Sequence, residues 1–238
     1  MALRELFVDY GEIRLLDVEC DAIDDMDGFV ILDDAEITHV KATLPSLPGG
    51  IENMLEMQRL GFQFVDRQID VSINLLRSRI DFGPLIRLKP RLTSERREEV
   101  LAVALRSFPR DRRFHLNLIP DAPDKHDKKS AYFVISKWVD ELEEYYVCEH
   151  RGELLGFLAP EKLEERRAFV HLAAVDERFR SSGAALSLYA NAAREFKERG
   201  FAALDGRIST LNAPVMNIYS VLGAFFSNPT DVFLKEMR

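Results

Sequence analysis

Residues 175–200, VDERFRSSGAALSLYANAAREFKERG, decide the fold, because here an apolar strand ends and a long amphipathic helix begins. The preceding stretch AFVHLAAV (168–175) is apolar almost throughout, as the central strand of a sheet should be. Alanine, tyrosine and phenylalanine recur on one face of the helix, so this face is predicted to pack on the sheet. The region is therefore typical of a strand, a short loop and a helix that lie against one another.

The loop between this strand and helix has the pattern R-x-x-G-x-A, at Arg180, Gly183 and Ala185. The first N–H groups of a helix lack intrahelical partners and carry the positive end of the helix dipole, so they bind anions. We expect a phosphate site here, with Arg180 adding charge. An ordinary turn, in which Ser181, Ser182 and Gly183 only cap the helix, is the alternative. The patterns of nucleotide hydrolysis and dinucleotide binding, G-x-x-x-x-G-K-[ST] and G-x-G-x-x-G, do not occur in the sequence.

A second strand and helix follow, and their order has a counterpart near the N-terminus. Residues 202–237 read as the strand AALDGRIS, the turn TLNAP, the helix VMNIYSVL, Gly223 and a strand pair, AFFSN and DVFLKEM. Residues 37–74 likewise read as strand, turn, helix, Gly61 and strand. In both regions Leu-Gly closes the helix, and Asp-Val follows nine residues after Gly61 and eight after Gly223. We interpret the two regions as related, with chance similarity as the alternative.

A stretch rich in Gly, Pro and Arg between these regions places a domain boundary near residue 85. We predict a smaller α+β domain over residues 1–85 and a larger α+β domain over residues 86–238. The larger domain is expected in the order helix, helix, three strands, helix, strand, helix and two strands. Its first helix begins at Thr93 or Ser94, and its second surrounds Trp138.

Composition and charge exclude several classes of partner. The 238 residues include 32 Lys and Arg against 40 Asp and Glu, so the net charge of −8 repels polyanions and we expect no nucleic-acid partner. No apolar run has the length of a membrane span, so we expect no membrane association and a cytoplasmic location. The two cysteines, Cys20 and Cys148, suit a reducing compartment. The histidines have no metal-ligand spacing, and no metal is expected.

Two motifs of the second half resemble the GNAT acyltransferase superfamily, and the resemblance covers residues 90–238. The first resembles V-x-P-x-x-[RQ]-G-x-G-x-[GA], with Glu177 in place of the Pro and Ser181 in place of a Gly. The second resembles N-x-x-A-x-x-L-Y-x-x-x-G-F with its spacing intact, with Ala224 in place of the Phe. The residues that carry the likeness are Val175, Arg180, Ser181, Gly183, Ala185, Asn212, Val215, Ile218, Tyr219, Gly223 and Ala224.

The resemblance implies a GNAT acyl-CoA fold of the α+β class, with a mixed, mostly antiparallel sheet flanked by helices. It further implies that residues 1–85 are a smaller, incomplete GNAT-like domain, because the chain is most similar to two-domain enzymes of the TDP-fucosamine acetyltransferase type. Acetyl-CoA would lie in a V-shaped opening between the central strand and the next one. The residues implied to hold it are Ala173, Ala174 and Val175 for the pantetheine arm, Arg180, Ser181, Ser182, Gly183, Ala184 and Ala185 for the pyrophosphate, and Asn212 and Tyr219.

Tyr219 is implied to be the catalytic acid, because a phenol that is protonated at neutral pH can give its proton to the departing thiolate of CoA. A helical tyrosine that only packs on the core is the alternative. No general base is identified, since neither His115 nor His171, the histidines placed near the expected cleft, is assigned a catalytic role. Arg113 and His115 are expected to bind the acceptor, with a solvated loop as the alternative reading of this segment.

The predicted function is acetyl-CoA-dependent N-acetylation of a primary amine of a small molecule, with a nucleotide-linked amino sugar as the favoured acceptor. One alternative is a GNAT enzyme that acts on another amine, such as an antibiotic, a polyamine or a protein N-terminus, and the net charge favours a cationic acceptor. The other is a non-catalytic CoA-binding module, which the departures at Ser181 and Ala224 favour. The expected partners are the small-molecule amine and, in a homodimer, a second copy of the chain.

Overall fold

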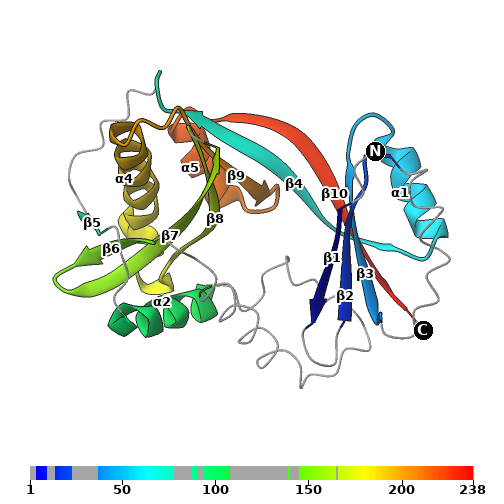
Figure 1. Ribbon diagram of the computed structural model, residues 1–238, viewed down its shortest axis with the longest axis horizontal. Coiled ribbons are helices and arrows are strands. Elements are labelled where there is room, and N and C mark those ends of the chain that lie inside the picture. The colour runs from blue at the N-terminus through cyan, green and yellow to red at the C-terminus, as the bar shows by residue number, and fades with distance from the viewer. Residues whose placement is uncertain are drawn as a thin grey trace.

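Figure 1 shows the computed structural model of the chain, which describes residues 4–9, 14–22, 37–77, 87–89, 94–107, 139, 145–164 and 166–237. The described strands form one ten-stranded sheet in the order β1-β2-β3-β10-β4-β9-β8-β7-β6-β5. Two neighbouring pairs in it, β2–β3 and β8–β9, are parallel, and the other pairs are antiparallel. The predicted α+β class with a mixed, mostly antiparallel sheet is therefore confirmed. The strands are β1 (Arg4–Asp9), β2 (Arg14–Glu19), β3 (His39–Pro45), β4 (Gln63–Asn74), β5 (Arg87–Lys89), β6 (Tyr146–His150), β7 (Glu153–Glu164), β8 (Arg167–Val175), β9 (Ala203–Ser209) and β10 (Phe225–Glu236).

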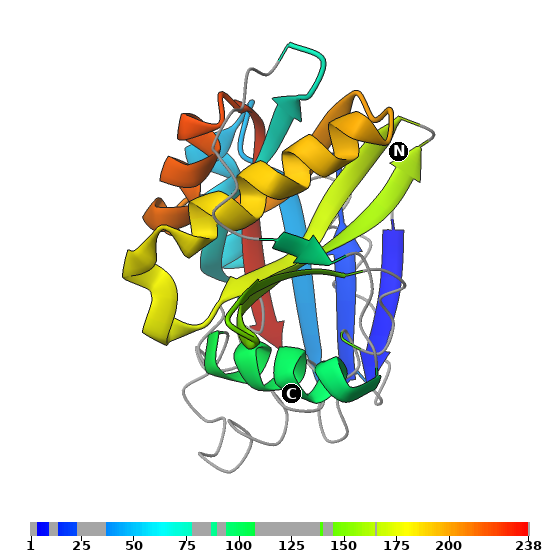
Figure 2. The ribbon, with the colours of Figure 1, turned by 90° about the vertical axis from the view of Figure 1, so that its left-hand side faces the viewer.

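Helices cover both faces of the sheet around β7. Leu188 of α4 shares a buried core with Leu158 of β7, whereas Leu101 of α2 shares a different core with Phe157 of the same strand. Because neighbouring residues of a strand point to opposite faces, α4 and α2 lie on opposite sides of the sheet, as Figure 2 shows. The described helices are α1 (Gly50–Arg59), α2 (Ser94–Ser107), the 3-10 helix η4 (Glu177–Ser182), α4 (Ala184–Glu198) and α5 (Ala213–Val221).

Two series of four strands in the sheet have the same pattern of parallel and antiparallel pairs. One series of strands is β1-β2-β3-β10 and the other is β7-β8-β9-β4. In each series the first pair is antiparallel, the second parallel and the third antiparallel. Each helix before the last strand ends in a glycine at positive φ, Gly61 (84°) after α1 and Gly223 (71°) after α5. The topology therefore supports the interpretation that β3-α1-β4 and β9-α5-β10 are related units.

The two units exchange their last strands. β4 follows α1 in the chain yet lies between β10 and β9, and β10 lies between β3 and β4. Figure 1 shows β4 and β10 as long strands that run from one lobe of the molecule to the other. The described strands among residues 1–85, β1 to β4, thus lie in one sheet with the strands of the rest of the chain. The predicted boundary at residue 85 lies outside the described residues and stays a prediction.

The predicted element order requires two corrections, and the first is the strand β5, which precedes α2 and was not predicted. The second is that the segments AFFSN and DVFLKEM are not two strands but one, β10, whose pairing with β4 shifts between Ser227 and Thr230. Asn228 lies at a φ of 49° and is followed by Pro229, which cannot donate to the ladder, so the chain bulges here and continues. The helix predicted around Trp138 lies outside the described residues. No helix within the described ranges has both the length and the apolar character needed to span a membrane.

Candidate active site

The site is built around a parting of two parallel strands. β8 and β9 pair from Arg167↔Ala203 to Val170↔Gly206, and beyond these positions both strands continue without pairing to each other. On the other side of β8, Leu172 pairs with Ala159 and Val170 with Pro160, so His171 is an extra residue in β8. This bulge coincides with the point where the strands separate, because a bulge bends and twists its strand. The V-shaped opening expected between the central strand and its neighbour is present.

The arm of β8 beside the opening is the stretch predicted to hold the pantetheine arm. Ala173, Ala174 and Val175 pair with β7 on one side and have no strand on the other. The five residues from His171 to Val175 span about 17 Å at strand spacing. This stretch of β8 is therefore a long wall of the opening, and its main-chain groups face the opening.

The junction that is predicted to bind an anion follows at the far end of this arm. Arg180, Ser181 and Ser182 lie in η4, and α4 begins at Ala184 after Gly183, whose φ of 79° is left-handed. A methyl group at Gly183 would meet no atom within 4 Å, so its backbone conformation and not crowding requires the glycine. The N–H groups at the start of the 15-residue helix α4 are the donors that a phosphate can use.

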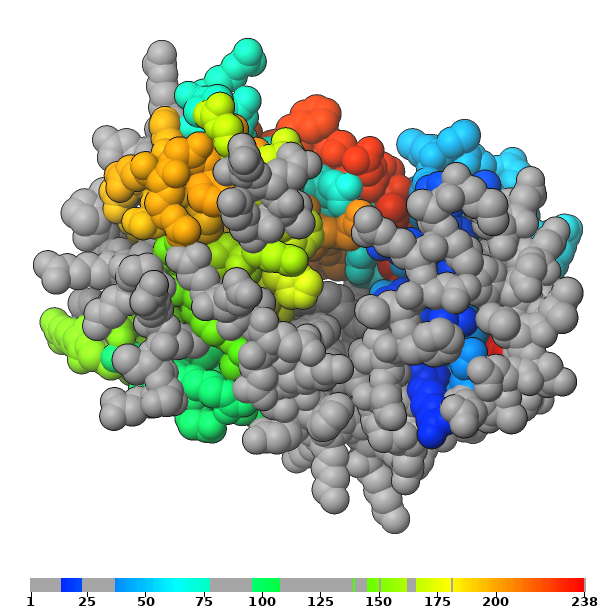
Figure 3. All heavy atoms as spheres, viewed as in Figure 1, coloured from blue at the N-terminus to red at the C-terminus, as the bar shows by residue number. Residues whose placement is uncertain are grey.

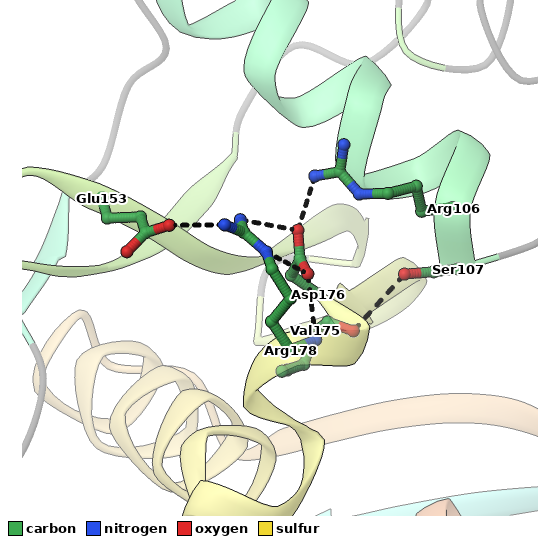
Figure 4. Close-up of polar contacts among 6 residues, drawn as sticks. All are labelled: Arg106, Ser107, Glu153, Val175, Asp176 and Arg178. Atoms are coloured by element: carbon green, nitrogen blue, oxygen red, sulfur yellow. Dashed lines mark hydrogen bonds and ion pairs between the residues drawn. The ribbon is translucent and has the colours of Figure 1, made fainter.

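The two arginines of this loop, Arg178 and Arg180, differ in their contacts, and Figure 4 shows those of Arg178. Arg178 is occupied, because its guanidinium contacts both oxygens of Asp176, with Nε 3.0 Å from Oδ1 and Nη2 3.1 Å from Oδ2, and its Nη1 lies 2.7 Å from Glu153 Oε1. Arg180 is exposed and makes no ion pair or hydrogen bond with any described residue through its side chain. The charge available to a ligand at this loop is therefore that of Arg180.

Asn212 begins the helix that carries Tyr219. Its Oδ1 accepts a hydrogen bond from the main-chain N–H of Val215 at 3.4 Å, and Pro214 follows within the first turn of α5. Asn212 therefore caps α5, and it is exposed at the start of the helix. Its proposed contact with CoA stays a prediction.

Tyr219 is 1% exposed and lies with its ring edge against Tyr189 of α4, at a centroid distance of 5.2 Å. Its hydroxyl is directed at Gly206, where a methyl group would stand 2.8 Å from Tyr219 Oη. Gly206 is also the last residue of β9 that pairs with β8. The hydroxyl therefore lies against the apex of the opening.

The surroundings of Tyr219 keep it protonated. Burial raises the pKa of Tyr219 well above its ordinary value, and Tyr189 and then Asp205 raise the pKa further. The phenol is a proton donor over the whole physiological range. It can therefore serve as an acid and not as a base in its resting state.

Arg113 and His115 lie outside the described residues. His171 occupies the bulge, and its Nδ1 lies 3.9 Å from Glu161 Oε2. Within the described part of the chain, no three His, Cys, Asp or Glu side chains form a group that could hold a metal ion.

Sequence reasoning missed two residues of the site. Gly206 has a role only because the Tyr219 hydroxyl approaches it, and no local pattern signals that contact. Asp176 caps η4 by accepting from the Arg178 N–H at 3.1 Å. An Asp directly after an apolar strand is a helix-start signal that could have indicated the second of these residues.

Comparison with known proteins agrees with this geometry. The acetyltransferase (GNAT) family profile matches residues 108–224. The structure is similar to a GCN5-related N-acetyltransferase from Sphaerobacter thermophilus, with 14% identity, a TM-score of 0.66, and coverage of 99% of this chain and 76% of that one. It is similar to a tandem GNAT protein from the clavulanic acid biosynthesis pathway, with 12% identity, a TM-score of 0.60, and coverage of 98% and 78%.

A third similar structure is the glucosamine N-acetyltransferase region of a fungal multi-domain β-N-acetylglucosaminidase, with 13% identity, a TM-score of 0.63, and coverage of 98% of this chain and 31% of that one. No curated protein sequence matches the chain. At these identities the solved structures establish the fold. The chain has the fold of the GNAT acetyltransferases, and its residues 108–224 match the profile of that family.

Proposed function

We propose that the chain transfers the acetyl group of acetyl-CoA to a primary amine of a small molecule. The observation that carries this proposal is the opening between β8 and β9, about 17 Å long on its β8 side. It has the Tyr219 hydroxyl at its apex and an anion-binding junction at its far end. An extended ligand with phosphates at one end and a reactive thioester at the other suits this arrangement. Ala173, Ala174 and Val175 would hold its middle.

The chain's own groups supply two parts of the chemistry. Attack of a neutral amine on the thioester carbon forms the C–N bond and breaks the C–S bond, and the departing thiolate needs a proton. Tyr219 would donate that proton, because its hydroxyl lies at the apex and its raised pKa keeps it protonated at neutral pH. The N–H groups at the start of α4, together with Arg180, would fix the pyrophosphate and so hold the sulfur at the apex.

We place the acceptor in the hollow between the two lobes, where Figure 3 shows β4, β9 and β10 at the floor. Arg207 follows Gly206 and contacts Asp70 of β4 at 2.7 Å and Glu19 of β2 at 3.4 Å. In a flat sheet β2 and β9 would be about 19 Å apart, so the contact requires a strongly curved sheet. The carboxylates of Asp70 and Glu19 form an acidic wall of this hollow and would attract a cationic amine.

A nucleotide-linked amino sugar remains our favoured acceptor, from the sequence resemblance to the TDP-fucosamine acetyltransferase type. The similar fungal region is named for glucosamine N-acetylation, which is chemistry of the same class. An antibiotic, a polyamine or a protein N-terminus is the alternative that the acidic wall favours. Cys20 and Cys148 are buried and form no disulfide, which accords with the proposed cytoplasmic location.

A thiol-release assay tests the proposal. Acetyl-CoA is incubated with the protein and a panel of amino sugars, TDP-linked amino sugars, polyamines and aminoglycosides, and free CoA is measured. Release with one class of amine identifies the acceptor. Binding of acetyl-CoA in calorimetry without release on any amine would support the non-catalytic module, and absence of binding would refute the whole proposal.

A further inference from the structure

A fully buried carboxylate stands at the point where β8 leads into the anion-binding loop. Asp176 is 0% exposed and accepts four hydrogen bonds, three from Arg178 and one from Arg106 Nη2 at 2.5 Å. Figure 4 shows these two arginines reaching it from η4 and from the end of α2. Burial of a carboxylate costs free energy unless partners of this kind compensate its charge. The two arginines therefore supply what the buried charge of Asp176 requires.

The main chain of Asp176 is held as firmly as its side chain. Its N–H donates to Leu155 O at 2.8 Å, and its carbonyl accepts from the Phe179 N–H at 2.9 Å. The neighbouring Val175 carbonyl accepts from Ser107 Oγ of α2 at 3.4 Å. The start of the loop is thereby tied to β7, to η4 and to α2 at once.

The negative charge of Asp176 repels the pyrophosphate that the loop is proposed to bind. A carboxylate a few residues from a pyrophosphate site repels the ligand, and its charge would be absent if the loop were selected for anion attraction alone. Two guanidinium groups neutralise this carboxylate and are themselves used up in doing so. The hydrogen-bonding geometry of Asp176, and not its charge, is therefore what this position contributes to the loop.

We infer that Asp176 is a positioning residue that holds the loop in the shape that receives the pyrophosphate of CoA, with Arg178 as part of this support and Arg180 as the arginine that meets the ligand. The inference rests on the proposed function and deepens it. It gives Arg178, to which the sequence pattern assigned no role, a part in the support of the loop. It also connects the end of α2, on the opposite face of the sheet, with the CoA loop.

The test compares two ligands in titration calorimetry, acetyl-CoA and S-acetylpantetheine, which lacks the pyrophosphate. Asp176→Ala is expected to weaken acetyl-CoA binding by about tenfold, since a cap and a charge network are both lost. Affinity for S-acetylpantetheine should stay within about twofold, because the β8 arm and the apex are unaffected. Asp176→Asn retains an acceptor for the Arg178 N–H and should give a smaller loss, about threefold.

The outcomes separate the inference from the proposed function. Unchanged acetyl-CoA binding by the folded variants would show that Asp176 does not support the loop, and tighter binding would show that it acts only through its charge. An equal loss for both ligands would show general destabilisation. Each of these results overturns the positioning role, and the asparagine variant decides where the alanine variant does not fold. Asp17→Asn, which removes a carboxylate paired with Lys41 at 2.6 Å, is the charge-matched control and should leave both affinities unchanged. A wild-type protein that binds neither ligand would instead refute the proposed function.

Discussion

The contact between Gly206 and Tyr219 permits a direct test of where the catalytic hydroxyl lies. Gly206→Ala adds a methyl group that would stand 2.8 Å from Tyr219 Oη, 3.4 Å from Val71 Cγ2 and 3.7 Å from Tyr219 Cζ. The first distance is too short for a carbon and an oxygen, whereas the last is an ordinary contact. The hydroxyl alone therefore causes the clash, and the buried ring, packed on Tyr189, has to move to relieve it.

The magnitude follows from this geometry. Overpacking a filled site costs about 1–3 kcal/mol, so Gly206→Ala should lower the free energy of unfolding by that amount. In Tyr219→Phe the hydroxyl is gone, and the same methyl group should then cost less than about 0.5 kcal/mol. The two substitutions should thus show a coupling energy of at least about 0.5 kcal/mol in a double-mutant cycle.

Catalysis should show the same coupling. Tyr219→Phe should lower kcat by about 10²-fold if the hydroxyl protonates the thiolate, with little change in acetyl-CoA affinity. Gly206→Ala displaces that hydroxyl and should lower kcat by about tenfold or more. The double variant should be no slower than Tyr219→Phe alone, because its clash is relieved and its proton donor is already lost.

Urea unfolding of the four proteins and steady-state kinetics on a verified acceptor measure both effects. Additive free energies of unfolding would mean that the hydroxyl does not contact Gly206. A kcat of Tyr219→Phe within about twofold of the wild type would mean that another group supplies the proton, since a positioned acid contributes far more. Tyr219 would then be a packing residue.

Three further predictions concern the loop, the first unit and acid stability. Gly183→Val should abolish acetyl-CoA binding in calorimetry with an unchanged circular dichroism spectrum, because valine disfavours the φ of 79°; unchanged affinity would remove the loop from the site. Calorimetry should give one CoA per chain, because β2 and β3 stay paired through Glu19↔Thr43 and leave no opening; two equivalent sites would refute this. Hydrogen bonds from Arg178, then its main-chain N–H and Arg106, hold the pKa of Asp176 below its usual range despite burial. Its stabilising contribution should therefore be present above the unfolded carboxyl pKa of about 3.9 and be lost as the pH falls below that value. The stability difference between wild type and Asp176→Asn, from urea unfolding at pH 2 to 7, should shrink at acid pH, and a constant difference would contradict the assignment.

The sequence by itself determined the local elements of the site. A helix at Ala184–Glu198, its glycine entry and the cap at Asn212 follow from residues within a few positions of one another, because capping and helical periodicity are short-range effects. The apolar run before the loop likewise predicted a buried strand, and the Leu-Gly pairs predicted two related helix ends. The α+β class followed from the order of these elements.

Only the tertiary structure decided how the elements meet. The bulge at His171 depends on the register of β8 against β7, and the exchange of β4 and β10 depends on which strands pair, neither of which hydrophobic pattern specifies. Arg106 reaches Asp176 across 70 positions of sequence, and the Tyr219 hydroxyl meets Gly206 on another element. Such contacts join residues that share no local pattern, so they exist only once the sheet has brought their elements together.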